Sequence, residues 1–192
     1  GGMGRGLAIL YATFFAAFSV YQPRVMDQTP AFGFMVLVTA AGLFLAVRHE
    51  AVFLACAAIL GGFATPVLLA TGTNARDALF AYVLVLIAGV LGVAYARTWL
   101  VLERLAFLGT FILFARWYGR YFSEGQLEPT LAWLAVFYLA FLAMPFGYHL
   151  RTATAVPVGG VVFALANAIV AFGFAWDMLK AHHASALGFV AL

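Results

Sequence analysis

The run AVFLACAAILGGFATPVLLA, residues Ala51–Ala70, contains no charged residue and is as long as a membrane-crossing helix. About 20 apolar residues in an α-helix cross the hydrocarbon core of a bilayer, which is about 30 Å thick. Two glycines and a proline lie within this run, where a soluble helix would bend or break. In membrane helices both residue types are frequent. The run therefore predicts a transmembrane helix with a local irregularity at Gly61–Pro66.

The residues around the proline predict how this irregularity is accommodated. Proline has no backbone N–H, and its ring presses on the carbonyl four residues earlier, which belongs to Gly62. A glycine there avoids a Cβ collision, and Thr65 can donate a hydroxyl hydrogen bond to the Gly61 carbonyl. We interpret this group as a motif for a kinked, closely packed helix, and it comprises Gly61, Gly62, Thr65, Pro66 and Gly72.

The same motif has two interpretations. Ala57, Gly61 and Thr65 lie four residues apart, and a row of small residues favours close packing of a second helix. Alternatively, a broken helix can bind a substrate or ion through its freed backbone groups at mid-membrane depth. A transporter or permease with a kinked helix at Gly61–Pro66 is therefore the alternative to a structural role.

The composition of the whole chain also favours a membrane protein. Of its 192 residues, 66% are hydrophobic and 9% are charged, whereas about 25% are charged in soluble domains. The ten Lys and Arg and the seven Asp and Glu fall singly or in pairs between apolar runs, which excludes a nucleic-acid-binding patch. A single cysteine, Cys56, excludes a disulfide framework.

Seven apolar runs of near-membrane length predict an all-α, polytopic protein with short antiparallel hairpin connections. An eighth helix is expected to start near Ser185. Basic residues divide five to five between the two faces, so the orientation stays open. We expect residues 1–192 to form a single transmembrane bundle, a piece of a longer membrane protein. The runs are Gly6–Tyr21, Pro30–Val47, Ala51–Ala70, Ala78–Ala96, Trp99–Ala115, Thr130–Tyr148 and Ala155–Trp176.

Four blocks of the sequence carry a resemblance to a known family. They are LGGFATPVLLATG, the glycine-containing helix that begins LFAYVLVL, the tight turn Arg97-Thr98-Trp99, and LAFLGTFILF. Over roughly Arg5 to Pro145 the chain resembles the DUF2339 family of predicted bacterial polytopic membrane proteins. The resemblance implies a helical architecture and a bacterial inner-membrane setting. The function of that family is unknown, so the resemblance implies no catalytic residue.

Polar groups within apolar runs are candidates for function because a charge in lipid is costly. Glu103 and Arg104 lie one turn past Trp99, and Asn167 is near the centre of the seventh run. Glu103 is either a proton or substrate ligand or an interfacial charge paired with a neighbouring helix. Asn167 is either part of a polar pathway or a partner in an interhelical hydrogen bond.

The segment RWYGRY combines arginines with aromatic residues at the end of the fifth run. Arg116, Trp117, Tyr118 and Arg120 are candidate contacts for lipid headgroups, since arginine forks suit phosphate and aromatic rings suit sugar faces. The alternative is an aromatic belt with arginines that reach the interface. The segment admits a membrane enzyme acting on lipid-linked glycan or headgroup substrates, although no catalytic motif occurs.

The sequence thus predicts an integral membrane protein of unassigned biochemical function, with a structural or assembly role favoured over transport and over catalysis. The expected partners are the lipid bilayer and other transmembrane helices, and we expect no cofactor or metal. The adjacent His182 and His183 point to different sides of a helix and lack the ligand spacing of a zinc site.

Overall fold

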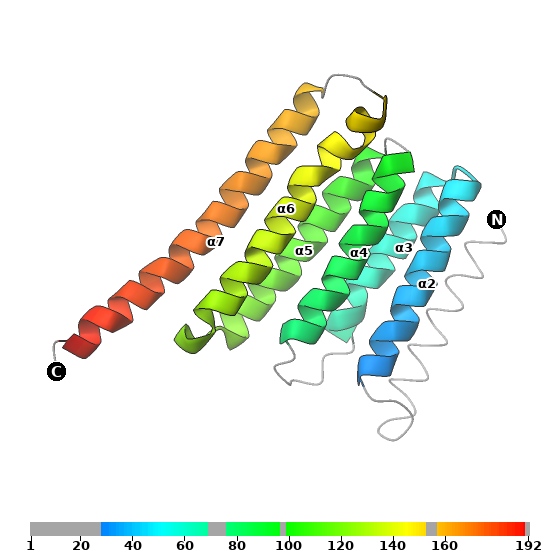
Figure 1. Ribbon diagram of the computed structural model, residues 1–192. Coiled ribbons are helices and arrows are strands. Elements are labelled where there is room, and N and C mark those ends of the chain that lie inside the picture. The colour runs from blue at the N-terminus through cyan, green and yellow to red at the C-terminus, as the bar shows by residue number, and fades with distance from the viewer. Residues whose placement is uncertain (1–27, 69–75, 97–98, 153–156, 191–192) are drawn as a thin grey trace. The chain divides into compact units, whose positions relative to one another are not determined.

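A computed structural model describes residues 28–68, 76–96, 99–152 and 157–190, and these ranges are helical with short connections and without strands (Figure 1). This confirms the all-α prediction for the described residues. The first predicted run, Gly6–Tyr21, lies outside them, as does Gly72. The elements are α2 (Gln28–Arg48), α3 (Val52–Leu68), α4 (Arg76–Ala96), α5 (Leu100–Tyr121), a 3₁₀ turn η1 (Glu124–Gln126), α6 (Leu127–Thr152) and α7 (Val158–Val190).

Three of the described helices are long and apolar enough to cross a membrane. The apolar segments are Arg76–Val93 of α4, Leu127–Pro145 of α6 and Val158–Ala181 of α7. Two shorter apolar segments, Val36–Arg48 and Val52–Val67, belong to α2 and α3. The predicted number of seven or eight membrane helices is therefore not confirmed. The chain divides into two compact units, residues 1–114 and 115–192, and the prediction of a single bundle stays a prediction.

In the first unit, α2, α3 and α4 pack against one another, and α2 and α3 form a hairpin (Figure 1). The packed faces combine small and aliphatic side chains with a few aromatic rings, and large apolar side chains also cover the outside. A soluble protein rarely exposes so much apolar surface, so this outer surface suits hydrocarbon. The packed residues include Leu43, Ala46, Ala55, Ala58, Ile59, Val83, Leu86, Ile87 and Val90; the exposed ones include Leu37, Phe44, Phe53, Leu60 and Val85.

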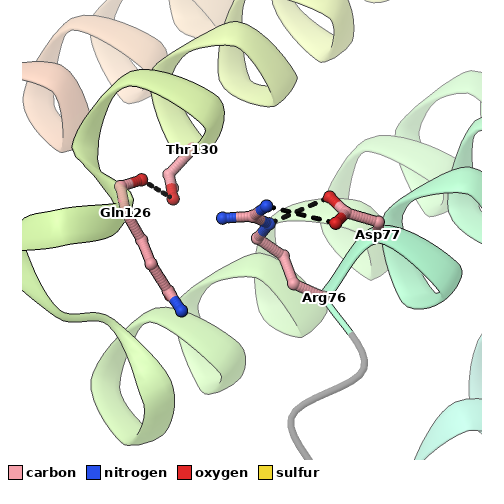
Figure 2. Close-up of polar contacts among 4 residues, drawn as sticks. All are labelled: Arg76, Asp77, Gln126 and Thr130. Atoms are coloured by element: carbon pink, nitrogen blue, oxygen red, sulfur yellow. Dashed lines mark hydrogen bonds and ion pairs between the residues drawn. The ribbon is translucent and has the colours of Figure 1, made fainter.

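The start of α4 is ordered by local charges. Arg76 and Asp77 form a two-pronged ion pair, with Nε to Oδ1 at 3.0 Å and an Nη to Oδ2 at 3.1 Å (Figure 2). Asp77 also lies in the first turn of α4, where the helix dipole favours a negative charge. The pair therefore favours initiation of the helix at Arg76, two residues before the predicted run.

The turn between α2 and α3 depends on a residue in the left-handed conformation. Among the described residues other than glycine, Glu50 alone has a positive φ, which is 54°. The Ala51 N–H donates to the Ala46 carbonyl at 2.9 Å and the Glu50 N–H to the Val47 carbonyl at 3.4 Å. These two bonds satisfy carbonyls at the helix end in the Schellman pattern, which usually has glycine at the left-handed position.

We expect Glu50→Val to have a free energy of unfolding about 1–2 kcal/mol lower than Glu50→Gly, because a Cβ is strained in the left-handed conformation. Both variants remove the same carboxylate, so their difference isolates the backbone. The measurement is SDS-driven unfolding in mixed micelles, followed by reaction of the Cys56 thiol with a maleimide dye. Equal midpoints for the two variants would contradict a left-handed residue 50.

In the second unit, α6 and α7 form an antiparallel hairpin. Phe141 of α6 meets Phe163 of α7 edge to face, with ring centroids 6.4 Å apart. At the start of α6, Pro129 lies in the first turn, where its missing N–H costs little. The Thr130 hydroxyl donates to the Gln126 carbonyl at 2.6 Å, so the helix begins at Leu127, three residues before the predicted run (Figure 2).

The structure corrects the expected eighth helix. The sequence predicts a new helix near Ser185, but residues 158–190 form one continuous helix, α7. Asp177 and Lys180 make the segment after Trp176 polar, and polarity suggested a loop. The segment contains no proline, and its alanines favour helix, so the backbone continues through it.

Candidate functional site

Pro66 leaves the Gly62 carbonyl without its helical N–H donor, and a side chain from the next helix donates to this carbonyl instead. The Tyr82 hydroxyl of α4 donates to the Gly62 carbonyl of α3 at 2.8 Å. Tyr82 is 4% exposed, so this hydrogen bond is shielded from water. The expected hydrogen bond from the Thr65 hydroxyl to the Gly61 carbonyl is also present, at 2.9 Å. Both carbonyls of the Gly-Gly pair therefore accept hydrogen bonds within the first unit.

Gly62 is also a point of close approach between α3 and its neighbours. A Cβ at this position would lie 3.1 Å from Leu86 of α4 and 3.2 Å from Thr39 Oγ1 of α2. Close packing against α2 and α4 thus falls on the face of α3 that carries the buried Ala58 and Gly62. The predicted row Ala57–Gly61–Thr65 differs from it, because Ala57 is exposed and Gly61 half-buried.

A second close approach involves Gly109 in α5. A Cβ there would lie 2.6 to 2.9 Å from ring carbons of Phe63, which is buried in α3. Real Cβ contacts are not this short, so α5 can pack against α3 only with glycine at this position. Sequence reasoning assigned no role to Tyr82 or Gly109, although both lie in blocks that carry the family resemblance. Their partners lie 20 or more residues away, and local spacing does not reveal them.

The two adjacent charges of α5 point in different directions. Glu103 is 6% exposed and lies in the first turn, where the helix dipole stabilises a carboxylate. Arg104 is exposed. Among the described residues of the first unit, Glu103 is therefore a buried charge, as expected for either a ligand or a structural charge.

Asn167 connects the two helices of the second unit. Its side-chain Nδ2 donates to the Tyr138 carbonyl of α6 at 2.9 Å, and the residue is fully buried. Its Oδ1 is also buried and has no hydrogen-bond partner among the described residues. The amide thus makes an interhelical hydrogen bond and leaves one acceptor unsatisfied.

The residues of RWYGRY have different environments in the structure. Trp117 is 3% exposed, whereas Arg116 and Arg120 are exposed, and the Arg120 guanidinium lies 5.7 Å from the centre of the Tyr121 ring. Tyr118 contacts α7 instead: its hydroxyl donates to Asp177 Oδ2 at 2.7 Å.

The Tyr118 hydroxyl lies beyond the apolar run that ends at Ala115. Burial, the hydrogen bond to Asp177 and the negative charge of that carboxylate raise the pKa of Tyr118 to about 12. The phenol therefore stays protonated at neutral pH and remains a hydrogen-bond donor.

Among the described residues, no group of three or more His, Cys, Asp or Glu is placed to hold a metal ion, and the side chains of His182 and His183 lie outside them.

Comparison with known proteins identifies the family. The family model described as "Predicted membrane protein (DUF2339)" matches residues 3–192, which extends the resemblance well past Pro145. Searches of curated proteins and of solved structures found no match. Since the matched region covers nearly all of the sequence, the chain belongs to the DUF2339 family of predicted membrane proteins.

Proposed function

We propose that this chain is a multi-pass component of the bacterial inner membrane with a structural or assembly role. In this proposal the helices cross the bilayer seven times, and their partners are lipids and other transmembrane helices. The observation that carries the proposal is the hydrogen bond from Tyr82 to the Gly62 carbonyl at 2.8 Å. The Gly62 carbonyl lacks its usual helical donor because Pro66 has no N–H, and this bond uses that carbonyl for contact between two helices.

Transport through the Gly61–Pro66 region would use the same carbonyls differently. A broken helix binds ions or substrates because its freed carbonyls face a cavity. Here the carbonyls of Gly61 and Gly62 accept hydrogen bonds from Thr65 and Tyr82. A Cβ at Gly62 would also meet Leu86 and Thr39, so side chains fill the space beside this backbone. These contacts support a packing role for the motif.

Transport elsewhere in the chain is the second candidate, and two buried polar groups favour it. Glu103 is almost fully buried in α5, and Asn167 Oδ1 is buried without a partner among the described residues. Polar groups of this kind inside a membrane mark substrate and proton pathways in transporters. The structural proposal assigns Glu103 to the start of α5 and Asn167 to the contact between α6 and α7.

A complementation experiment separates these two candidates. In the intact protein, Glu103→Gln and Asn167→Leu are each expected to restore fully the phenotype of a gene deletion, because neither group acts on a substrate. Membrane abundance of each variant is measured by immunoblot. Loss of complementation at normal abundance would contradict the structural role and favour transport.

Catalysis on lipid-linked glycan or headgroup substrates is the third candidate. Arg116 and Arg120 are exposed and four residues apart, so they share one face of α5, but Trp117 is buried and Tyr118 bonds to Asp177. Replacement of both arginines by glutamine is expected to leave complementation intact. A loss of complementation by this double variant at normal abundance would support the headgroup site.

A further inference from the structure

A groove lies between α6 and α7 in the second unit. Its volume is about 420 Å³, within the range of about 300–1,000 Å³ typical of ligand sites. The walls are almost entirely apolar, and alanines on α7 leave the space open. The groove is lined by Leu131, Leu134 and Tyr138 of α6 and by Ala168, Phe172 and Ala175 of α7, among others.

One wall of the groove continues along α7 to a cation. Phe172 of the groove is 68% exposed and stacks on Trp176, with ring centroids 6.2 Å apart. The Lys180 ammonium lies 5.5 Å from the centre of the Trp176 ring. These three residues are four apart, so they form one line on the helix surface. The neighbouring carboxylate of Asp177 accepts the Tyr118 hydrogen bond at 2.7 Å.

The dimensions of this line fit one leaflet of a bilayer. Ala168 and Lys180 are twelve residues apart, about 18 Å along an α-helix. Half of the hydrocarbon core is about 15 Å thick. A groove that begins near Ala168 therefore lies at acyl-chain depth when Lys180 is at the headgroups. A void beside packed side chains forfeits dispersion contacts, and an acyl chain restores them.

We infer that the groove between α6 and α7 binds one acyl chain of a glycerophospholipid whose phosphate contacts Lys180. Lysine is a common phosphate ligand, and the Lys180 ammonium lies over the Trp176 ring, five residues past Ala175 of the groove lining. The site is independent of the proposed assembly role, because it requires only that α6 and α7 lie in a bilayer.

The test uses the full chain, purified, delipidated and titrated with palmitoyl-oleoyl-phosphatidylglycerol, with bound lipid counted by native mass spectrometry. We expect one tightly held lipid per chain. Ala168→Leu with Ala175→Leu fills the groove and should weaken retention about tenfold or more, a loss of about 1.4 kcal/mol. The matched control, Ala132→Leu with Ala143→Leu, changes exposed alanines of α6 outside the groove and should retain the lipid.

Two further measurements test the headgroup contact and the identity of the occupant. Lys180→Gln should weaken the binding of phosphatidylglycerol several-fold. The same change should leave the binding of dioleoylglycerol, which has no phosphate, unchanged. A benzophenone amino acid in place of Phe172 should cross-link to lipid in membranes. Unchanged retention in the groove-filled variant would overturn the inference. So would a cross-link from position 172 to this chain, to a second copy or to another protein, because a helix would then cover the groove.

Discussion

Replacement of Tyr82 by phenylalanine is expected to lower the free energy of unfolding by about 1–3 kcal/mol. The change removes one hydroxyl and leaves the ring volume of a buried residue almost unchanged. Its cost arises at Gly62, whose carbonyl accepts the Tyr82 hydrogen bond at 2.8 Å and has no helical N–H to replace it. In lipid no water can reach an unpaired carbonyl. The loss is measured by SDS-driven unfolding in mixed micelles, with Cys56 as the reporter.

Replacement of Pro66 tests whether the unpaired Gly62 carbonyl causes this loss of stability. In the Pro66→Ala background, residue 66 regains an N–H that can donate to the Gly62 carbonyl in the normal helical pattern. Tyr82→Phe should then cost about 1–2 kcal/mol less than it does in the native sequence. Tyr138→Phe is the control, because it removes a hydroxyl from another helix without affecting Gly62. An equal cost of Tyr82→Phe in both backgrounds would show that the hydroxyl does not serve this carbonyl.

The hydrogen bond of Thr65 shows what sequence reasoning can reach. Its acceptor, the Gly61 carbonyl, lies four residues earlier, and helix geometry alone fixes this relation. The same geometry identifies Gly62 as the carbonyl that Pro66 frees. The donor, Tyr82, lies 20 residues away on α4. Which residues of two helices meet depends on the length and shape of the connection, and apolar periodicity does not encode it.

Apolar periodicity also fails to predict the burial of Trp117 and the residue at which α7 ends. An aromatic residue at a membrane boundary suits a headgroup as well as a protein interior, so the sequence could not place the Trp117 ring, which the structure buries. In α7, the polar residues Asp177 and Lys180 end the apolar run but not the helix. A backbone without proline can leave the hydrocarbon and remain helical.

Replacement of Gly109 by alanine is expected to lower the free energy of unfolding by about 1–3 kcal/mol, as overpacking of a buried contact does. The added Cβ would lie 2.6 Å from a ring carbon of Phe63. Because Phe63 is buried and its ring is rigid, α5 must move away from α3 to make room. Gly92 of α4 is the matched control, since a Cβ there meets no atom within 4 Å.

The two substitutions should therefore have opposite signs. Gly92→Ala is expected to raise stability by about 0.5–1 kcal/mol, because alanine loses less backbone freedom in a helix than glycine does. Gly109→Ala gains the same backbone term, so the cost of the collision with Phe63 is its net loss plus the gain measured for Gly92→Ala. In the Phe63→Leu background the collision is with a smaller, more flexible side chain, and Gly109→Ala should cost less by about 1 kcal/mol or more. If Gly109→Ala raised the unfolding midpoint as Gly92→Ala does, α5 would not pack against Phe63 in the membrane.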